Sequence, residues 1–149
     1  MIVIHRYGRK NITWFSQYFK RSLGIWFDQV DFANHKPIEK EDILFTYAVM
    51  FYQVLTGVHP YGGTILSAPY DKCVEIGQCI DNDLFAFGSK AEYITFPESF
   101  NLHSTFHTLS GEIQELFKRA FGTASASRPT LEEWGKGFYN CVVQLDSKN

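Results

Sequence analysis

Residues 42–63 read DILFTYAVMFYQVLTGVHPYGG, and this stretch decides the fold that we expect. From Ile43 to Leu55 the only plainly polar side chains are those of Thr46 and Gln53. A helix without a polar face belongs in the middle of a domain rather than on its surface. Gly57 supplies a typical helix end. The sequence therefore predicts a central helix over 43–55 that is the most buried helix of the molecule.

Two further helices are predicted on the C-terminal side of this stretch. Ser110 precedes one apolar face, and Thr130 with Glu133 forms a capping-box pair ahead of another. The apolar positions at helical spacing are Ile113, Leu116, Phe117 and Ala120 in the first helix, and Leu131, Trp134, Phe138, Cys141 and Val142 in the second. A weaker helix is predicted from Pro69 to Ile80, and residues 81–108 read as a long ordered loop.

The first 27 residues differ in charge from the rest of the chain. They carry no acidic residue, whereas the remainder carries 9 basic and 16 acidic residues, a balance of −7. The basic residues of this segment are Arg6, Arg9, Lys10, Lys20 and Arg21. Aromatic residues at helical spacing predict a short amphipathic helix from Thr13 to Leu23. Residues 28–41 read as an irregular connection, and we place the boundary between an N-terminal segment, 1–36, and a helical domain, 37–149.

The basic N-terminal segment has two readings. Its charges are interleaved with Trp14, Phe15, Tyr18 and Phe19, a mixture that would suit phosphate contacts and base stacking, or an anionic membrane surface. Aromatic residues at helical spacing are nevertheless more often part of a core. We therefore expect this helix to pack on the rest of the molecule, and we expect neither a nucleic acid nor a membrane as partner.

Composition places the chain among cytoplasmic single-domain proteins. With 149 residues, 45% of them hydrophobic, it is long enough to bury one core. The three cysteines, Cys73, Cys79 and Cys141, are an odd number without metal-ligand spacing, as is typical of reduced thiols. No apolar run has the length of a signal-peptide core or a membrane span.

Three stretches, taken in order, resemble the later helices of the large lobe of a protein kinase. Residues 42–63 are similar to the central helix of that lobe and the His-Pro turn after it. Residues 109–121, LSGEIQELFKRAF, resemble its penultimate helix, and Arg128-Pro129-Thr130 resembles the motif that opens the last one. Residues 80–88, IDNDLFAFG, resemble a segment of a bacterial branch of kinase-like proteins. The resemblance covers roughly residues 40–145.

The resemblance implies a mainly α fold, a truncated kinase large lobe with a buried central helix, surrounding helices and a long ordered loop. The positions that match the structural motifs of the family are Asp42, Gly57, His59, Pro60, Arg128, Pro129 and Trp134. In the family the counterpart of Arg128 pairs with a glutamate that is not legible here. We expect a substitute carboxylate for Arg128, from Glu39 or Glu41 first and from Asp28 or Asp31 second. The alternative is that Arg128 is exposed in a loop, where an ion pair would add only about 0–1 kcal/mol of stability.

The sequence lacks the groups that phosphoryl transfer needs. A kinase requires a glycine-rich phosphate cradle, a catalytic aspartate and metal-binding Asp and Asn side chains. Residues 5–11, HRYGRKN, echo a catalytic loop, but Tyr7 stands where the aspartate belongs and Asn11 comes one residue early. We read this as a chance match in a basic segment rather than a degenerate catalytic loop. We therefore expect no catalytic residue, no cofactor, no metal and no small-molecule substrate.

Other candidate site residues have ordinary structural explanations. Asp42 would serve as a cap or anchor of the central helix rather than as a catalytic acid. His103 and His107 have the spacing of a metal pair, but no third ligand accompanies them at a recognisable spacing. Cys73 and Cys79 are expected to be packing residues. No Ser/His/Asp or Cys/His nucleophile pattern is present in the sequence.

Two functions of different classes remain. The first is a non-catalytic protein interaction module whose surface helices, chiefly the one near 69–80, bind a partner protein. The second is a part of a serine/threonine protein kinase whose nucleotide-binding lobe and catalytic loop come from another chain or from lost upstream sequence. The first function is consistent with the missing catalytic groups. It also fits a truncated fold, because removal of one part of a two-lobed protein exposes apolar surface, and such surface tends to bind a partner.

Overall fold

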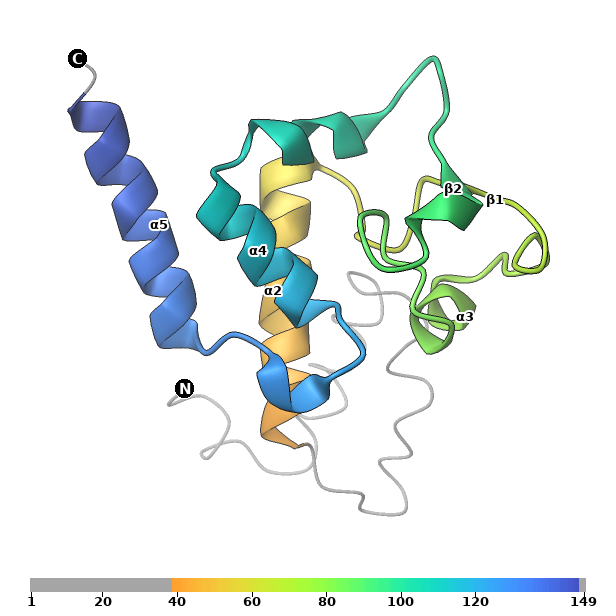
Figure 1. Cartoon of the computed structure of the whole chain (residues 1–149), viewed down its shortest axis with the longest axis horizontal. Coiled ribbons are helices and arrows are strands. Elements are labelled where there is room, and N and C mark those ends of the chain that lie inside the picture. Colours follow the sequence, from red (N-terminus) through yellow and green to blue (C-terminus); the bar gives the residue numbers. More distant parts are fainter. Residues whose placement is uncertain (1–38, 148–149) are drawn as a thin grey trace, which may run out of the picture.

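The computed structural model describes residues 39–147, and this part of the chain is mainly helical (Figure 1). Its α-helices are α2 (Lys40–Thr56), α3 (Ile76–Asp81), α4 (Gly111–Ala120) and α5 (Leu131–Asp146). Two short strands, β1 (Ile65–Leu66) and β2 (Ile94–Thr95), and 3₁₀ turns at Ala91–Tyr93, Leu102–Thr108 and Ser125–Ser127 complete it. The predicted helix at 13–23 and the boundary near 36 lie outside the described residues.

Helix α2 starts earlier than predicted, at Lys40, because a capping interaction fixes its first turn. The Asp42 carboxylate accepts a hydrogen bond of 3.1 Å from the backbone N–H of Glu39, the residue before the helix. This bond satisfies a donor that precedes the first helical turn. The last turn ends at Gly57, whose φ of 80° is a left-handed conformation that favours glycine. The predicted end of the helix is confirmed.

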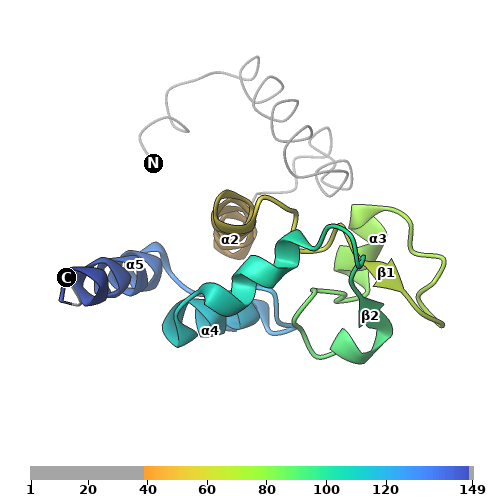
Figure 2. The same cartoon turned by 90° about the horizontal axis from the view of Figure 1, so that it is seen from above.

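Helix α2 contributes more buried residues than any other described helix, in line with the prediction, but it is buried on one face only. Ala48, Val49 and Tyr52 are inaccessible, but Met50 is 39% exposed and Val54 83% exposed. The helix contacts the Leu102–Thr108 turn and α4. Seen end-on in Figure 2, α4 crosses α2 on one side, and among the described elements none covers the opposite side. Lack of a polar face in the sequence therefore did not imply complete burial.

Helices α4 and α5 begin where the sequence predicts. The Ser110 hydroxyl accepts from the N–H of Ile113 at 3.3 Å, and the Thr130 hydroxyl accepts from the N–H of Glu133 at 3.2 Å. The Glu133 carboxylate accepts in return from the N–H of Thr130 at 2.8 Å, which completes a capping box. The predicted apolar face of α4 is buried throughout.

Helix α5 packs on the molecule through its first half. Trp134 is buried against α2 and α4, with its ring 5.3 Å from that of Phe51 and 4.8 Å from that of Phe117. A side chain at Gly137 would meet Leu116 at 3.0 Å, so glycine permits the close approach of the two helices. Leu131 and Val142, which the periodicity places on the packed face, are exposed instead. Cys141 still lies 3.1 Å from the Ser110 hydroxyl, and from Val142 on every residue of α5 is exposed (Figure 1).

Helix α3 is shorter than the predicted helix at 69–80. Its N-terminus is fixed at Ile76, because the side-chain oxygen of Gln78 accepts from the N–H groups of Val74 and Glu75 at 2.9 and 3.2 Å. Residues 67–73 form turns instead, with the N–H of Tyr70 bonded to the carbonyl of Ser67 at 2.9 Å. A proline that suits a first helical turn was thus misleading here.

The stretch 81–108 contains regular elements, which are the strand β2 and two 3₁₀ turns, rather than a loop alone. Strands β1 and β2 pair antiparallel, with Ile65 opposite Thr95 and Leu66 opposite Ile94. Strands of two residues are too short to show an alternating pattern, and so they were missed. The Leu102–Thr108 turn packs on α2 and buries His103 and Phe106.

The core is an aromatic cluster centred on Tyr52 of α2. Its ring lies within 5.1 to 6.1 Å, centroid to centroid, of four phenylalanines from three different parts of the chain, which are Phe85, Phe106, Phe117 and Phe121. Such ring pairs add stability beyond that expected from the area they bury.

In residues 39–147 no helix has both the length and the apolar character of a membrane span.

Candidate functional site

A buried tyrosine and a buried histidine form a hydrogen-bond chain at the centre of the core. The Tyr52 hydroxyl lies 2.7 Å from Nδ1 of His103, and Nε2 of the same ring lies 2.7 Å from the carbonyl oxygen of Gly62. A carbonyl only accepts, so Nε2 carries the proton and Nδ1 of the neutral ring accepts from the hydroxyl. This chain joins α2, the turn after it and the Leu102–Thr108 turn.

A second buried histidine, His59, lies in the turn after α2. Its Nδ1 accepts from the N–H of Tyr61 at 3.2 Å, and its Nε2 is buried without a hydrogen-bond partner among the described residues. Burial first, and then the charge that His103 would carry, lower the pKa of His59 to about 4. Burial also lowers the pKa of His103, while its bond to the Gly62 carbonyl opposes that shift. Both rings are therefore neutral near pH 7.

His103 and His107 do not form a metal pair. His103 is committed to its two hydrogen bonds inside the core. His107 is exposed, and its ring lies edge-on to that of Phe87 at 5.0 Å. Across residues 39–147 no group of three or more His, Cys, Asp or Glu side chains is arranged to hold a metal ion.

Arg128 reaches the first turn of α2, but it forms an ion pair with neither of the two described candidates, Glu39 and Glu41. Its Nη1 donates to the backbone carbonyl of Glu41 at 2.8 Å, and its guanidinium lies 4.9 Å from the ring centre of Phe45. Its Nε is buried and has no hydrogen-bond partner within residues 39–147. A helical carbonyl supplies only a partial charge, so burial is the largest influence on the pKa of Arg128 and lowers it. Asp28 and Asp31 lie outside the described residues.

The other positions that carry the kinase resemblance lie close to α2. Asp42 caps this helix and Gly57 ends it. Pro60 and Pro129 are fully buried, and the Pro60 carbonyl accepts from the N–H of Ala86 at 3.3 Å. The three stretches of the resemblance are thus brought together in space. They form a packed junction rather than an open site.

The two cysteines of the α3 region pack as expected. Both are free thiols, with Cys79 buried and Cys73 partly buried. The Cys79 sulfur lies 3.9 Å from the carbonyl oxygen of Cys73, and burial raises the pKa of Cys79. A buried thiol with a raised pKa is a poor nucleophile.

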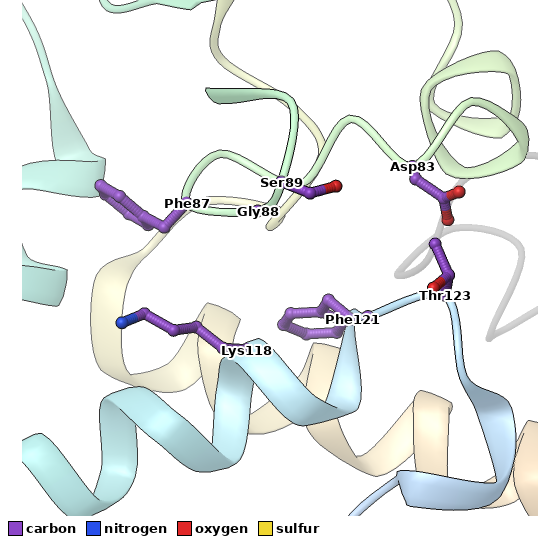
Figure 3. Close-up of a pocket in the computed structure, with 8 residues that line it drawn as sticks. Asp83, Phe87, Gly88, Ser89, Lys118, Phe121 and Thr123 are labelled. Carbon is purple, nitrogen blue, oxygen red and sulfur yellow. The ribbon is translucent and has the colours of Figure 1, made fainter. Parts of the chain in front are cut away.

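A shallow pocket of about 260 Å³ lies between α4 and the turn that follows α3 (Figure 3). Asp83 and Lys118 stand at opposite ends of it, and Ser89 and Thr123 add hydroxyl groups. Lys118 already pairs with Glu115 at 2.8 Å. The lining includes no histidine or cysteine, and its ionisable side chains are those of Asp83 and Lys118. The pocket therefore offers polar and charged contacts on a shallow surface.

Sequence reasoning missed the Tyr52–His103 chain. The two residues are 51 positions apart, and neither stands in a pattern that signals the other. The only hint was a histidine in a stretch rich in aromatic residues, which predicts that the histidine is buried but does not identify its hydrogen-bond partner.

No family model, no curated protein and no solved structure matches this chain.

Proposed function

We propose that residues 39–147 form a kinase-like large-lobe fragment that acts in the cytoplasm as a non-catalytic protein interaction module. The observation that carries the proposal is the exposed, uncharged end of α5. Residues 138–145 contain no charged side chain. The exposed apolar residues here are Tyr139, Val142, Val143 and Leu145. An uncharged apolar helix end is the kind of surface that a protein partner covers.

The kinase-like part of the proposal draws support from the packing around α2. Arg128 belongs to the motif that opens the last helix in the resemblance, and α2 corresponds to the central helix. Arg128 contacts the first turns of α2 through the Glu41 carbonyl and the Phe45 ring. Trp134 then packs against α2 and α4 together. Motifs 70 residues and more apart thus meet at one helix, which is what a shared architectural origin would require.

The non-catalytic part draws support from the polar groups themselves. The buried histidines are neutral, and His103 is engaged on both ring nitrogens. The pocket between α4 and the turn that follows α3 has no histidine or cysteine in its lining. The chemistry of the described residues therefore favours packing and recognition over group transfer.

The site of recognition differs from the one that the sequence favoured. The segment 69–80 is mostly turns, and α3 itself has only six residues. Helix α5 offers a longer continuous surface, and we propose that its exposed end enters an apolar groove of the partner. Helix-in-groove recognition of this kind reads apolar side chains at successive turns.

Photo-crosslinking in the source cell tests this proposal. The photoreactive residue p-benzoylphenylalanine replaces Tyr139, which is 68% exposed, or Phe100, an aromatic control that is 71% exposed. We expect a discrete heteromeric adduct from position 139 that is lost with Val143→Lys, and no such adduct from position 100. Equal adducts from both positions, or none from 139, would contradict the proposal.

A further inference from the structure

The side of α2 that faces away from the core carries an apolar stripe. Its members are Ile43, Tyr47, Met50 and Val54. Their spacing of four, three and four residues keeps them within about 60° of one another around a helix that turns 100° per residue. Tyr47 is partly buried, and the other three are exposed, from 36% at Ile43 to 83% at Val54. The buried Ala48, Val49 and Tyr52 lie on the opposite side.

This spacing is that of a helix-packing seam. Single exposed apolar residues are ordinary on a protein surface, but a stripe at heptad spacing is what one helix presents to another. Among the described elements none covers this side of α2, as Figure 2 shows. The stripe therefore suits the packing of another helix that has an apolar face about three turns long.

We propose that this occupant is the segment 13–23 of the same chain, docked antiparallel to α2. The segment lies outside the described residues, and its sequence predicts an amphipathic helix. Trp14, Phe15, Tyr18 and Phe19 would form its apolar face. At about 1.5 Å per residue, a helix from Thr13 to Leu23 and the stripe from Ile43 to Val54 are both about 16 Å long.

Charge favours the same pairing and sets its direction. Residues 1–27 hold five basic residues and no acid, whereas residues 39–147 hold 7 basic and 14 acidic residues. Lys20 and Arg21 stand near the C-terminal end of the segment, and Glu39, Glu41 and Asp42 stand at the start of α2. An antiparallel arrangement brings these groups together and places Trp14 near Val54. The basic residues also lie at the end of the segment that a helix dipole favours.

The connection between the two helices allows this arrangement. Residues 24–39 can span about 50 Å when extended, well beyond the length of the stripe. A flexible tether of this length holds the segment at an effective concentration near the millimolar range. Binding in cis is thus favoured over binding of a second copy at ordinary protein concentrations. The inference goes beyond the proposed function, since it requires neither the kinase resemblance nor a partner at α5.

Photo-crosslinking in the purified full chain tests the inference. The residue p-benzoylphenylalanine replaces Val54 or, as a control of equal exposure in another region, Val74, which is 84% exposed. Adducts are separated by size and mapped by mass spectrometry. We expect a monomeric product in which position 54 is joined to the segment 13–23, and no such product from position 74.

A double variant in the segment supplies the second arm. Tyr18→Asp with Phe19→Asp should lower the crosslink from position 54 about tenfold or more, because unpaired charges resist burial against an apolar stripe. Far-UV circular dichroism and the melting temperature show whether the described domain stays folded in this variant. A dimeric adduct, an adduct outside 13–23, or a crosslink unchanged by the two aspartates would overturn the inference.

Discussion

His59 and His103 tie the stability of the fold to pH through two buried rings. Burial lowers the pKa of His59 from 6.5 to about 4 and lowers that of His103 as well. As the pH falls below about 6.5, these two histidines therefore bind protons in the unfolded chain but not in the folded chain, and this difference favours unfolding. We predict that the free energy of unfolding is highest above pH 7 and falls between about pH 6.5 and 4. The contribution of His59 alone is on the order of 3 kcal/mol.

Urea denaturation at pH values from 5 to 8 measures this dependence. His59→Gln keeps an acceptor for the N–H of Tyr61 but has no titrating ring, so its profile should be flatter between pH 6.5 and 5. His107→Gln, an exposed histidine of the same region, serves as the control and should keep the slope of the parent protein. If all three profiles have the same slope, the buried histidines are not the groups responsible.

Within residues 39–147, Arg128 stabilises the junction of α5 with α2 through a carbonyl and a ring and forms no ion pair. We predict that Arg128→Ala lowers the free energy of unfolding by about 1–3 kcal/mol, because it removes a charged hydrogen bond and a cation–π contact. Arg128→Lys should recover only part of this loss, since an ammonium cannot reproduce the planar fork of the guanidinium.

A double-mutant cycle separates the backbone contact from an ion pair. Glu41→Ala keeps the carbonyl that Arg128 contacts, so the coupling energy between Arg128→Ala and Glu41→Ala should stay below about 0.5 kcal/mol. A coupling well above that value would show that the Glu41 carboxylate is the true partner.

At the level of elements, the sequence predicts a helix best where a capping residue marks its first turn. The Ser110 and Thr130 caps gave the starts of α4 and α5, because each hydroxyl bonds a backbone N–H only a few residues away. The predicted start at Pro69 failed, since the interaction that begins α3 comes from the Gln78 side chain, four residues beyond Val74. Local polar contacts can thus be read from sequence when their residue types are specific, and not otherwise.

Helix α2 provides an internal test of which face is packed. We predict that Val49→Asp leaves the chain unfolded or insoluble, because Val49 is inaccessible and an unpaired buried charge is costly. Val54→Asp, on the same helix and equally apolar in the parent, should still unfold cooperatively, since position 54 lies away from the core. Thermal denaturation followed by circular dichroism compares the two. Equal damage from both substitutions would contradict the one-sided burial of α2.

For the whole molecule, the sequence predicted the mainly α fold and its central helix but not which contacts hold it together. Apolar periodicity tells which side of α4 is buried, because that face alternates with charged residues. In α2 nearly every residue is apolar, so the buried face depends on what packs there, and that information lies in distant residues such as Phe106 and Phe117. The Tyr52–His103 hydrogen bond was not predicted for the same reason, because its two residues are 51 positions apart in the sequence.

The proposal of a non-catalytic module makes its clearest prediction for nucleotide binding. A kinase binds ATP through a phosphate cradle, a lysine and carboxylate-held magnesium. In residues 39–147 no three His, Cys, Asp or Glu side chains gather to hold a metal, and Lys118, at the edge of the pocket, is paired with Glu115. We predict that isothermal titration of the purified full chain with ATP and magnesium gives no saturable heat in the micromolar range. ATP with EDTA provides the matched titration, because a kinase site holds the phosphates of ATP through magnesium. Micromolar, magnesium-dependent binding of ATP would reject the non-catalytic proposal and favour a chain that contributes to a kinase.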